Sequence, residues 1–353
     1  MSMKIATLIP AYRLDYLISA INSVLRQTVT PSLIIVSDDS PSGEISKLIE
    51  SDNWPEKLKT KNIVLQVVAG PRKKSSYLNF MNLCEVWDNQ TDFFHFLCDD
   101  DYIFPLFYQK HLLLLTKNDL MASVSRRWQG DKHGQVIGAF NIPSFIENSE
   151  GKQMSIEPSA LFKSVVPQCN NWLGEISNAF FHKTSMDALK TAELGGYSFY
   201  GLDDIGIFLF LGKYRKLGFI NEHLSFFRSH ENQNTGNLDS PDFLAAHLAW
   251  IPIAMGSEKL GLIDKDDKDK VIKKMLNLVI TRYQKSDVYD IIYEIFGQFL
   301  IPQDRIEPFV ESAFLECWEF FVTQRKAGYT FKDFCEHSLS PSIQKSDDQG
   351  LPL

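Results

Sequence analysis

The chain has 353 residues, of which 44% are hydrophobic and 23% charged, as is ordinary for a globular protein with a large core. Its formal net charge of −8 argues against a general nucleic-acid-binding protein. Five scattered cysteines without a Cys-x-x-Cys pair indicate neither a disulfide framework nor a zinc site. With no signal-peptide pattern at the start, this composition predicts a cytoplasmic protein.

Strand-like and helix-like segments alternate along the first 97 residues. Apolar runs of strand length occupy residues 5–9, 33–36, 63–68 and 93–97. Hydrophobic residues at helical spacing lie between these runs, in residues 14–25, 45–49 and 76–86. This alternation predicts an α/β fold with a parallel sheet and helices on both faces. Polar loops follow the strands at Pro10, Asp38 and Asp99, so we expect all three loops at one edge of the sheet.

Three consecutive carboxylates, Asp99, Asp100 and Asp101, follow the apolar run at residues 93–97. Adjacent carboxylates repel one another unless a cation or a solvated turn offsets their charge. Mn²⁺ or Mg²⁺ commonly joins such carboxylates to the phosphates of a substrate. The pattern predicts a divalent metal site at the edge of the sheet, and an acidic surface loop is the alternative.

Two further groups of charged residues belong to the same predicted edge. Asp38 and Asp39 could each accept a hydrogen bond from the imide of a uracil or thymine base, or from a ribose hydroxyl. A simple turn after the strand is the alternative interpretation. Arg72 and Lys73, in a Gly-Pro-Arg-Lys-Lys stretch, suit a diphosphate, although a solvated basic loop has the same composition.

A second acidic pair, Asp203 and Asp204, opens an apolar segment that is predicted to be a helix. Acids are favoured at a helix N-terminus by the helix dipole, so a capping role is one interpretation. A general base is the other. Trp172 is either a platform for a sugar ring or a core residue, and His95 within Phe-Phe-His-Phe is interpreted as core.

Several motifs in order resemble the family 2 glycosyltransferases of the GT-A fold, over about residues 4–230. They are Thr7-Leu-Ile-Pro-Ala-Tyr12, Ala20-Ile-Asn-Ser-Val-Leu-Arg-Gln-Thr28, Ile34-Ile-Val-Ser-Asp-Asp-Ser40, and Leu97-Cys-Asp-Asp-Asp-Tyr with Pro105. The resemblance implies a Rossmann-like nucleotide-binding sheet and inverting transfer of a sugar from a nucleotide-diphosphate donor. The acceptor would be a hydroxyl of a saccharide, a lipid-linked molecule or a protein.

The resemblance also implies roles for individual residues. The nucleotide would be held by Pro10, Ala11, Tyr12, Asp38 and Asp39. The Asp-x-Asp signature, which in the family holds metal and the donor's ribose, maps onto Asp99 and Asp101, with Asp100 also in reach of the donor. His230 of an Arg-x-His motif could complete the metal site or contact phosphate. Asp204 would be the base beside Asp203, with Trp172 and Glu175 near donor sugar and acceptor. The family often has a further Asp where this chain has Cys98, which leaves the main metal ligand open.

The resemblance ends at about residue 239, and the pattern beyond it is helical. We therefore expect a GT-A domain at 1–238, with a nucleotide half at 1–120 and an acceptor half at 121–238. A helical domain at 239–339 and a disordered tail at 340–353 would follow. The helices are expected to pack on the catalytic domain. Alternatives are a homo-oligomer interface, or a surface for a lipid-linked or protein acceptor that brings the enzyme to a membrane.

The sequence thus predicts a metal-dependent inverting glycosyltransferase of bacterial surface polysaccharide or glycoconjugate synthesis. A non-catalytic nucleotide-sugar-binding module is an alternative, which would not need Asp204. A sugar-phosphate nucleotidylyltransferase is another, but the start of the chain has no Gly-rich loop with Arg.

Overall fold

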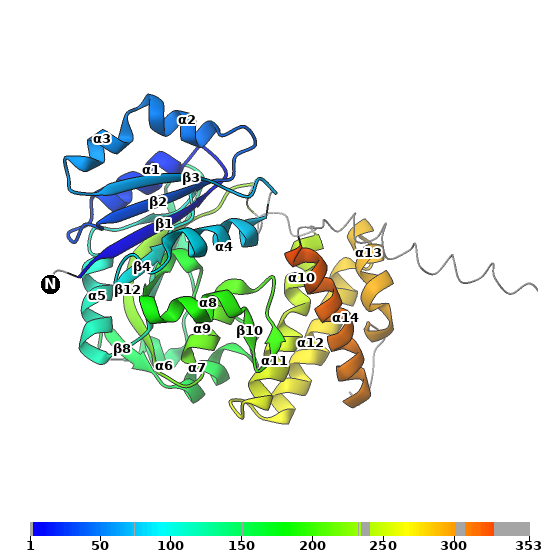
Figure 1. Ribbon diagram of the computed structural model, residues 1–353. Helices are drawn as coiled ribbons and strands as arrows, with labels where there is room; N and C mark the ends of the chain where they lie inside the picture. Colours follow the sequence, from blue (N-terminus) through cyan, green and yellow to red (C-terminus); the bar gives the residue numbers. More distant parts are fainter. Residues whose placement is uncertain are drawn as a thin grey trace, which may run out of the picture.

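The computed structural model describes residues 3–73, 75–149, 151–231, 233, 241–300 and 308–327. Within these residues, a ten-stranded mixed sheet forms the centre, with helices on both of its faces (Figure 1). The helices of the C-terminal part stand beside this α/β unit and complete the molecule (Figure 1).

Four parallel strands and their connecting helices form the first part of the sheet. The strands are β1 (Ile5–Ala11), β2 (Leu33–Asp38), β3 (Val64–Ala69) and β4 (Phe93–Phe96). The helices are α1 (Leu17–Leu25), α2 (Glu44–Ser51), α3 (Trp54–Lys59) and α4 (Ser76–Trp87). All four predicted strands and three predicted helices are confirmed, and α3 is an additional helix. Pro10 does not end β1 as predicted, because the chain stays extended to pair Ala11 with Asp38.

The second part of the sheet is built from shorter elements. Its strands are β5 (Tyr102–Ile103), β6 (Ala122–Gly130), β7 (Val136–Ala139), β8 (Gln153–Ile156), β9 (Ala179–His182) and β12 (Leu217–Arg228). A separate hairpin consists of β10 (Glu193–Leu194) and β11 (Tyr197–Ser198). The helices are α5 (Phe107–Asn118), α6 (Ser144–Glu147), α7 (Pro158–Val165), α8 (Met186–Thr191) and α9 (Asp203–Gly212), with 3-10 turns η1 (Ile176–Asn178) and η2 (Lys183–Ser185).

The predicted parallel pairing of the first four strands is confirmed, and the later strands make the sheet as a whole mixed. Eight strands follow the order β3-β2-β1-β4-β9-β6-β12-β5, while β7 pairs with β6 and β8 with β12. Strand β9 runs antiparallel to both of its neighbours, β4 and β6. It follows the turn η1 directly, so this turn lies at the end of β9 that adjoins the carboxyl end of β4.

Each face of the sheet covers its own hydrophobic core, because successive side chains of a strand point to opposite faces. Ile5 and Ile9 of β1 belong to a core that contains residues of α1, α2, α3 and α5. Ala6 and Leu8 belong to a second core with residues of α4, α8 and α9. Both faces of β1 and β4 are therefore buried, which explains why their sequences are largely apolar, with Thr7 and His95 as buried exceptions.

The C-terminal helices share the second core with the sheet. They are α10 (Pro241–Leu248), α11 (Trp250–Lys259), α12 (Lys265–Tyr283), α13 (Asp287–Phe296) and α14 (Pro308–Lys326), with the turn η4 (Gly297–Phe299) before α14. One continuous cluster of buried side chains runs from Leu8 and Phe94 to Phe314 and Trp318. Among the described residues, no helix is both long and apolar enough to cross a bilayer. The predicted tail at 340–353 lies outside the described residues.

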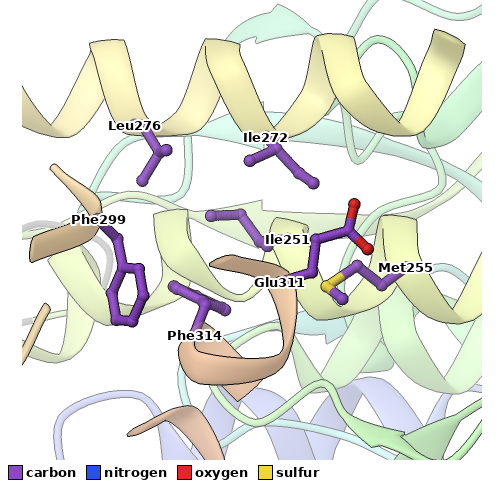
Figure 2. Close-up of a pocket in the computed structure, with 7 residues that line it drawn as sticks. All are labelled: Ile251, Met255, Ile272, Leu276, Phe299, Glu311 and Phe314. Atoms are coloured by element: carbon purple, nitrogen blue, oxygen red, sulfur yellow. The ribbon is translucent and has the colours of Figure 1, made fainter. Parts of the chain in front are cut away.

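Side chains from α11, α12 and α14 meet closely in the helical part (Figure 2). Figure 2 shows Ile251, Ile272 and Phe314 around a cavity, with the carboxylate of Glu311 at its side. The cavity measures about 10 Å³, which is room for at most one water molecule. Glu311 accepts a hydrogen bond of 2.6 Å from the buried Lys268 of α12, so an ion pair joins α12 to α14. This space is a packing defect and too small for a substrate.

Candidate active site

The loops after β1 and β4 meet at the carboxyl edge of the sheet, as the sequence predicts. The backbone N–H groups of Tyr12 and Arg13 donate to Asp99 Oδ2, over 2.7 and 2.9 Å. Burial raises the pKa of Asp99 to about 6, and the charge of Asp100 adds to the effect, while the two N–H groups act against it. Asp99 therefore fastens the β1–α1 loop to the acidic segment.

The other two acids of the segment form a separate group with Cys98. One ligand atom each from Cys98, Asp100 and Asp101 lies within 4.8 Å of the others. His230 Nε2 lies 3.0 Å from Asp100 Oδ2, which brings an imidazole to the same group. Burial raises the pKa of Asp101 well above its usual range, and the charge of Asp100 adds to this. Carboxylates with an imidazole, crowded in this way, are a donor set that fits a divalent cation.

The sequence placed the Asp-x-Asp signature on Asp99 and Asp101, and the structure divides these two residues. Asp101 lies in the group of Cys98, Asp100 and Asp101 that could hold a metal ion, whereas Asp99 is hydrogen-bonded to the β1–α1 loop. In the candidate metal site, Asp100 takes the place predicted for Asp99, and it is hydrogen-bonded to His230. The chain turns directly after β4, so adjacent acids point in different directions, which spacing alone could not predict.

Arg228 holds the end of β12 against the acidic segment. Its side chain is buried, its Nε donates to the Asp100 carbonyl over 2.8 Å, and its backbone N–H donates to Asp101 Oδ1 over 3.1 Å. Its guanidinium lies over the ring of Tyr16, 4.3 Å from the centroid, and the same ring lies 5.4 Å from that of His230. Tyr16 was not predicted as a site residue, because it falls in no motif of the sequence.

The acidic pair of α9 contacts the same turn, η1, as the group of Cys98, Asp100 and Asp101 does. Ile176 N–H donates to Asp204 Oδ1 over 3.1 Å. Burial raises the pKa of Asp204 to about 7, with smaller contributions from the charges of Glu175 and Asp203. Burial also raises the pKa of Asp203 to about 6. The N-cap residue of α9 is Leu202, which makes no side-chain cap, so neither acid is the N-cap of this helix.

Glu175 connects the two halves of the site electrostatically. Its charge acts to raise the pKa of both Asp101 and Asp204, so it lies within electrostatic range of each. Arg127 of β6 balances it, since Arg127 Nη2 donates to Glu175 Oε1 over 3.1 Å and its Nε contacts Oε2. The Arg127 guanidinium also lies 3.8 Å from the centroid of Phe140. A buried charged residue in a strand needs a partner of opposite charge, but the sequence alone does not show that Arg127 is buried.

The acids after β2 are engaged within their own loop. Asp38 accepts hydrogen bonds from the backbone N–H and hydroxyl groups of Ser40 and Ser46, at 3.0 and 2.9 Å for the two N–H groups. Burial acts to raise the pKa of Asp38, but these hydrogen bonds outweigh it and the pKa is lowered. Asp38 therefore stabilises the turn after β2. Asp39 accepts from the backbone of Arg72 and Lys73, which places both cations at the same edge.

Trp172 is a core residue in this structure. Its side chain is 2% exposed, and its ring meets the edge of Phe219 with 5.4 Å between centroids. Its Nε1 donates to Ser164 Oγ over 3.2 Å. Because its ring is covered, it offers no face to a sugar, and of the two interpretations the core role applies.

Comparison with known proteins gives a likeness in structure only. No family model matches the sequence, and no curated protein sequence matches it either. Residues 1–349 of Staphylococcus aureus TarS, solved in complex with UDP-GlcNAc, superpose with a TM-score of 0.55 at 14% identity, over 85% of this chain and 82% of that one. The same fragment with UDP gives 0.54 at 12% identity, over 93% and 92%. Likeness at such identity concerns the fold: the predicted GT-A sheet with a helical C-terminal region is confirmed.

Proposed function

We propose that this chain is a divalent-metal-dependent, inverting glycosyltransferase that moves a sugar from a nucleotide-diphosphate donor to an acceptor hydroxyl. One observation carries the proposal: Asp100, Asp101 and His230 meet at the carboxyl edge of a GT-A sheet, and Asp204 is held by the backbone of the turn η1 at the same edge. The S. aureus neighbour was solved with UDP-GlcNAc, which supports a nucleotide sugar as donor. Surface polysaccharide or glycoconjugate synthesis remains the proposed setting.

The donor would lie along the loops at this edge. Backbone groups of the β1–α1 loop, with Asp39, line the nucleotide side, and Arg72 and Lys73 are cations suited to the diphosphate. Asp100, Asp101 and His230 would hold Mn²⁺ or Mg²⁺, with Cys98 beside them. Such an ion stabilises the charge of the departing nucleoside diphosphate.

Asp204 is the proposed general base. A carboxylate with a pKa of about 7 is partly ionised at neutral pH and basic enough to accept a proton from a hydroxyl in the transition state. The hydrogen bond from Ile176 N–H fixes its Oδ1. The acceptor oxygen would attack the anomeric carbon as its proton passes to Asp204, opposite the departing diphosphate. Asp203 would support the start of α9.

A panel of nucleotide sugars, assayed for hydrolysis and transfer with and without Mn²⁺, tests the proposal. We expect turnover that EDTA stops, and we expect Asp100→Ala and Asp101→Ala to abolish it and to weaken metal-dependent nucleotide binding. The control is Glu56→Ala, a change to a largely exposed side chain of α3. Full activity in EDTA with unchanged donor affinity would contradict the metal's role. Mn²⁺-dependent UDP binding without any turnover would favour the non-catalytic binding module instead.

A further inference from the structure

Three fully buried polar side chains form a hydrogen-bonded chain beneath the site. Thr7 Oγ1 lies 2.6 Å from Tyr108 OH, which lies 3.1 Å from His95 Nδ1. His95 Nε2 lies 2.9 Å from the backbone oxygen of Ser177 in η1. Each of the three side chains has no exposed surface. The proposed mechanism uses none of them, although buried polar groups are costly unless every one is satisfied.

The chemistry of the end groups fixes the direction of every bond in this chain. A carbonyl oxygen only accepts, so His95 Nε2 carries a hydrogen and donates to Ser177. Burial lowers the pKa of His95 to about 4, so the ring is neutral at pH 7 and Nδ1 is an acceptor. Tyr108 OH must therefore donate to His95 Nδ1, and Thr7 donates to Tyr108. The result is one defined tautomer aimed at η1.

The turn that His95 contacts also touches both halves of the proposed active site. Ser177 Oγ accepts from the backbone N–H of Cys98 over 3.1 Å, which leaves its own hydrogen to bond the Asp101 carboxylate. The preceding residue, Ile176, donates its backbone N–H to Asp204. The same short turn, η1, thus contacts both Asp101 and Asp204 and sets the spacing between them.

We propose that His95 is a positioning residue that fixes the turn Ile176–Asn178, and through it the relative placement of Asp101 and Asp204. This inference rests on the proposed function of the same site. The Nε2–H of His95 anchors Ser177 from the core side, while the Ser177 hydroxyl contacts Cys98 and Asp101. His95, a residue of β4 five positions before Asp100, thus supports the proposed site from the interior of the sheet.

The core contains a matched control for this histidine. His111 of α5 is also fully buried, and its Nδ1 lies 2.7 Å from Ser123 Oγ. Its ring is tilted against that of Phe107, as is the ring of His95, with centroid distances of 4.2 and 4.7 Å. The hydrogen bond of His111 goes to β6 and not to η1. Replacing it perturbs the same core without releasing the turn.

The first test observes the tautomer directly. Long-range ¹H–¹⁵N correlation spectra of the imidazoles, with His95 assigned by comparison with His95→Gln, should show a neutral ring protonated at Nε2 at pH 7. A ring protonated at Nδ1, or an imidazolium, would overturn the proposal. This measurement needs neither substrate nor activity, so it stands apart from the proposed function.

The second test measures the affinity for Mn²⁺ with UDP by calorimetry in folded variants. His95→Phe should lose about 10–100-fold, the usual effect of removing a group that orients a metal ligand. His95→Gln, whose amide can still donate to Ser177, should recover most of the affinity, and His111→Phe should leave it unchanged. If His95→Phe does not fold, His95→Asn serves, since its shorter amide keeps the Tyr108 side and loses Ser177.

Equal losses in the His95 and His111 variants would reduce His95 to a packing role and overturn the proposal, as would failure of His95→Gln to recover affinity. Wild-type protein that binds Mn²⁺ and UDP while His95→Phe binds equally well would refute this inference alone. Wild-type protein that binds neither would refute the proposed function and this inference together.

Discussion

Asp204 is the residue on which binding and chemistry can be separated. If it accepts the acceptor's proton, its contribution is confined to the transition state. We expect Asp204→Asn to lower kcat on the order of 10²–10⁴-fold, the usual range for a positioned base, with little change in donor affinity. Asp203→Asn should cost less. Steady-state kinetics at saturating donor, with Tm checked, decide this, and a near-normal kcat for Asp204→Asn would exclude it as the base.

The same carboxylate gives a pH dependence of known sign. The folded-state pKa of Asp204 is about 7 against an ordinary 3.8, so folding favours its protonated form. Its contribution to stability is fully present below pH 3.8 and is lost as the pH rises through 7. If Asp204 is the proposed base, the activity should move in the opposite direction, because a base must be ionised to accept a proton.

Melting temperatures of wild type and Asp204→Asn, measured without metal from pH 4 to 8, test this linkage. The Tm of wild type should fall relative to that of the variant as the pH rises across this range. A difference in Tm that does not change with pH would show that Asp204 keeps an ordinary pKa.

At the scale of elements, α14 and α11 hold the segment that leads into α9. Trp318 Nε1 donates to the Ser198 carbonyl over 2.8 Å, and both residues are buried. Gly256 of α11 approaches the hairpin so closely that an added Cβ would lie 2.2 Å from the Leu194 carbonyl oxygen. The C-terminal helices are thereby in contact with the chain only a few residues before Asp203.

Trp318→Phe tests whether this contact matters for the acids. The change keeps an aromatic ring in the core and removes the N–H donor, which should cost about 1–3 kcal/mol because the Ser198 carbonyl is left unpaired. We expect kcat to fall more than nucleotide affinity, since the loops proposed to bind the nucleotide follow β1 and β2 and do not adjoin α14. Thr323→Ala, an exposed change on the same helix, is the control for kinetics and chemical denaturation. Equal kcat in all three proteins would limit α14 to a stabilising role.

The elements also show what the sequence could and could not predict. Most of β1 and all of β4 were predictable, because both strands are buried on both faces and their sequences are largely apolar. The position of β9 between β4 and β6 was not, because strand pattern carries no information on neighbour order. The three acids after β4 are evident in the sequence. That Asp99 and Asp100 have different partners depends on the backbone direction after β4, which the sequence does not show. The Arg127–Glu175 pair joins residues 48 apart, a distance over which periodicity is silent.

At the scale of the whole molecule, the sheet and the C-terminal helices depend on one core. The cluster that includes Leu8 and Phe94 continues through Met255 and Tyr283 to Trp318. A chain ending at residue 238 would expose the apolar surface that these helices cover. We expect such a truncation to aggregate or to lose its cooperative thermal transition, as followed by circular dichroism. A truncated chain with a sharp transition and intact UDP binding would show that the helices serve acceptor choice or assembly alone.

The strand order has a consequence for how the protein acquires its site with time. The Asp100–His230 contact spans 130 positions, and the strand that leads to His230 inserts between β6 and β5. During synthesis, the loops after β1 and β2 can form well before His230, the partner of Asp100, has been made. Contacts at such separation form late, because closing a long loop is entropically costly. Affinity for Mn²⁺ should therefore appear late in refolding, after β12 has inserted into the sheet. A nascent chain that lacks β12 should not bind the ion at this site.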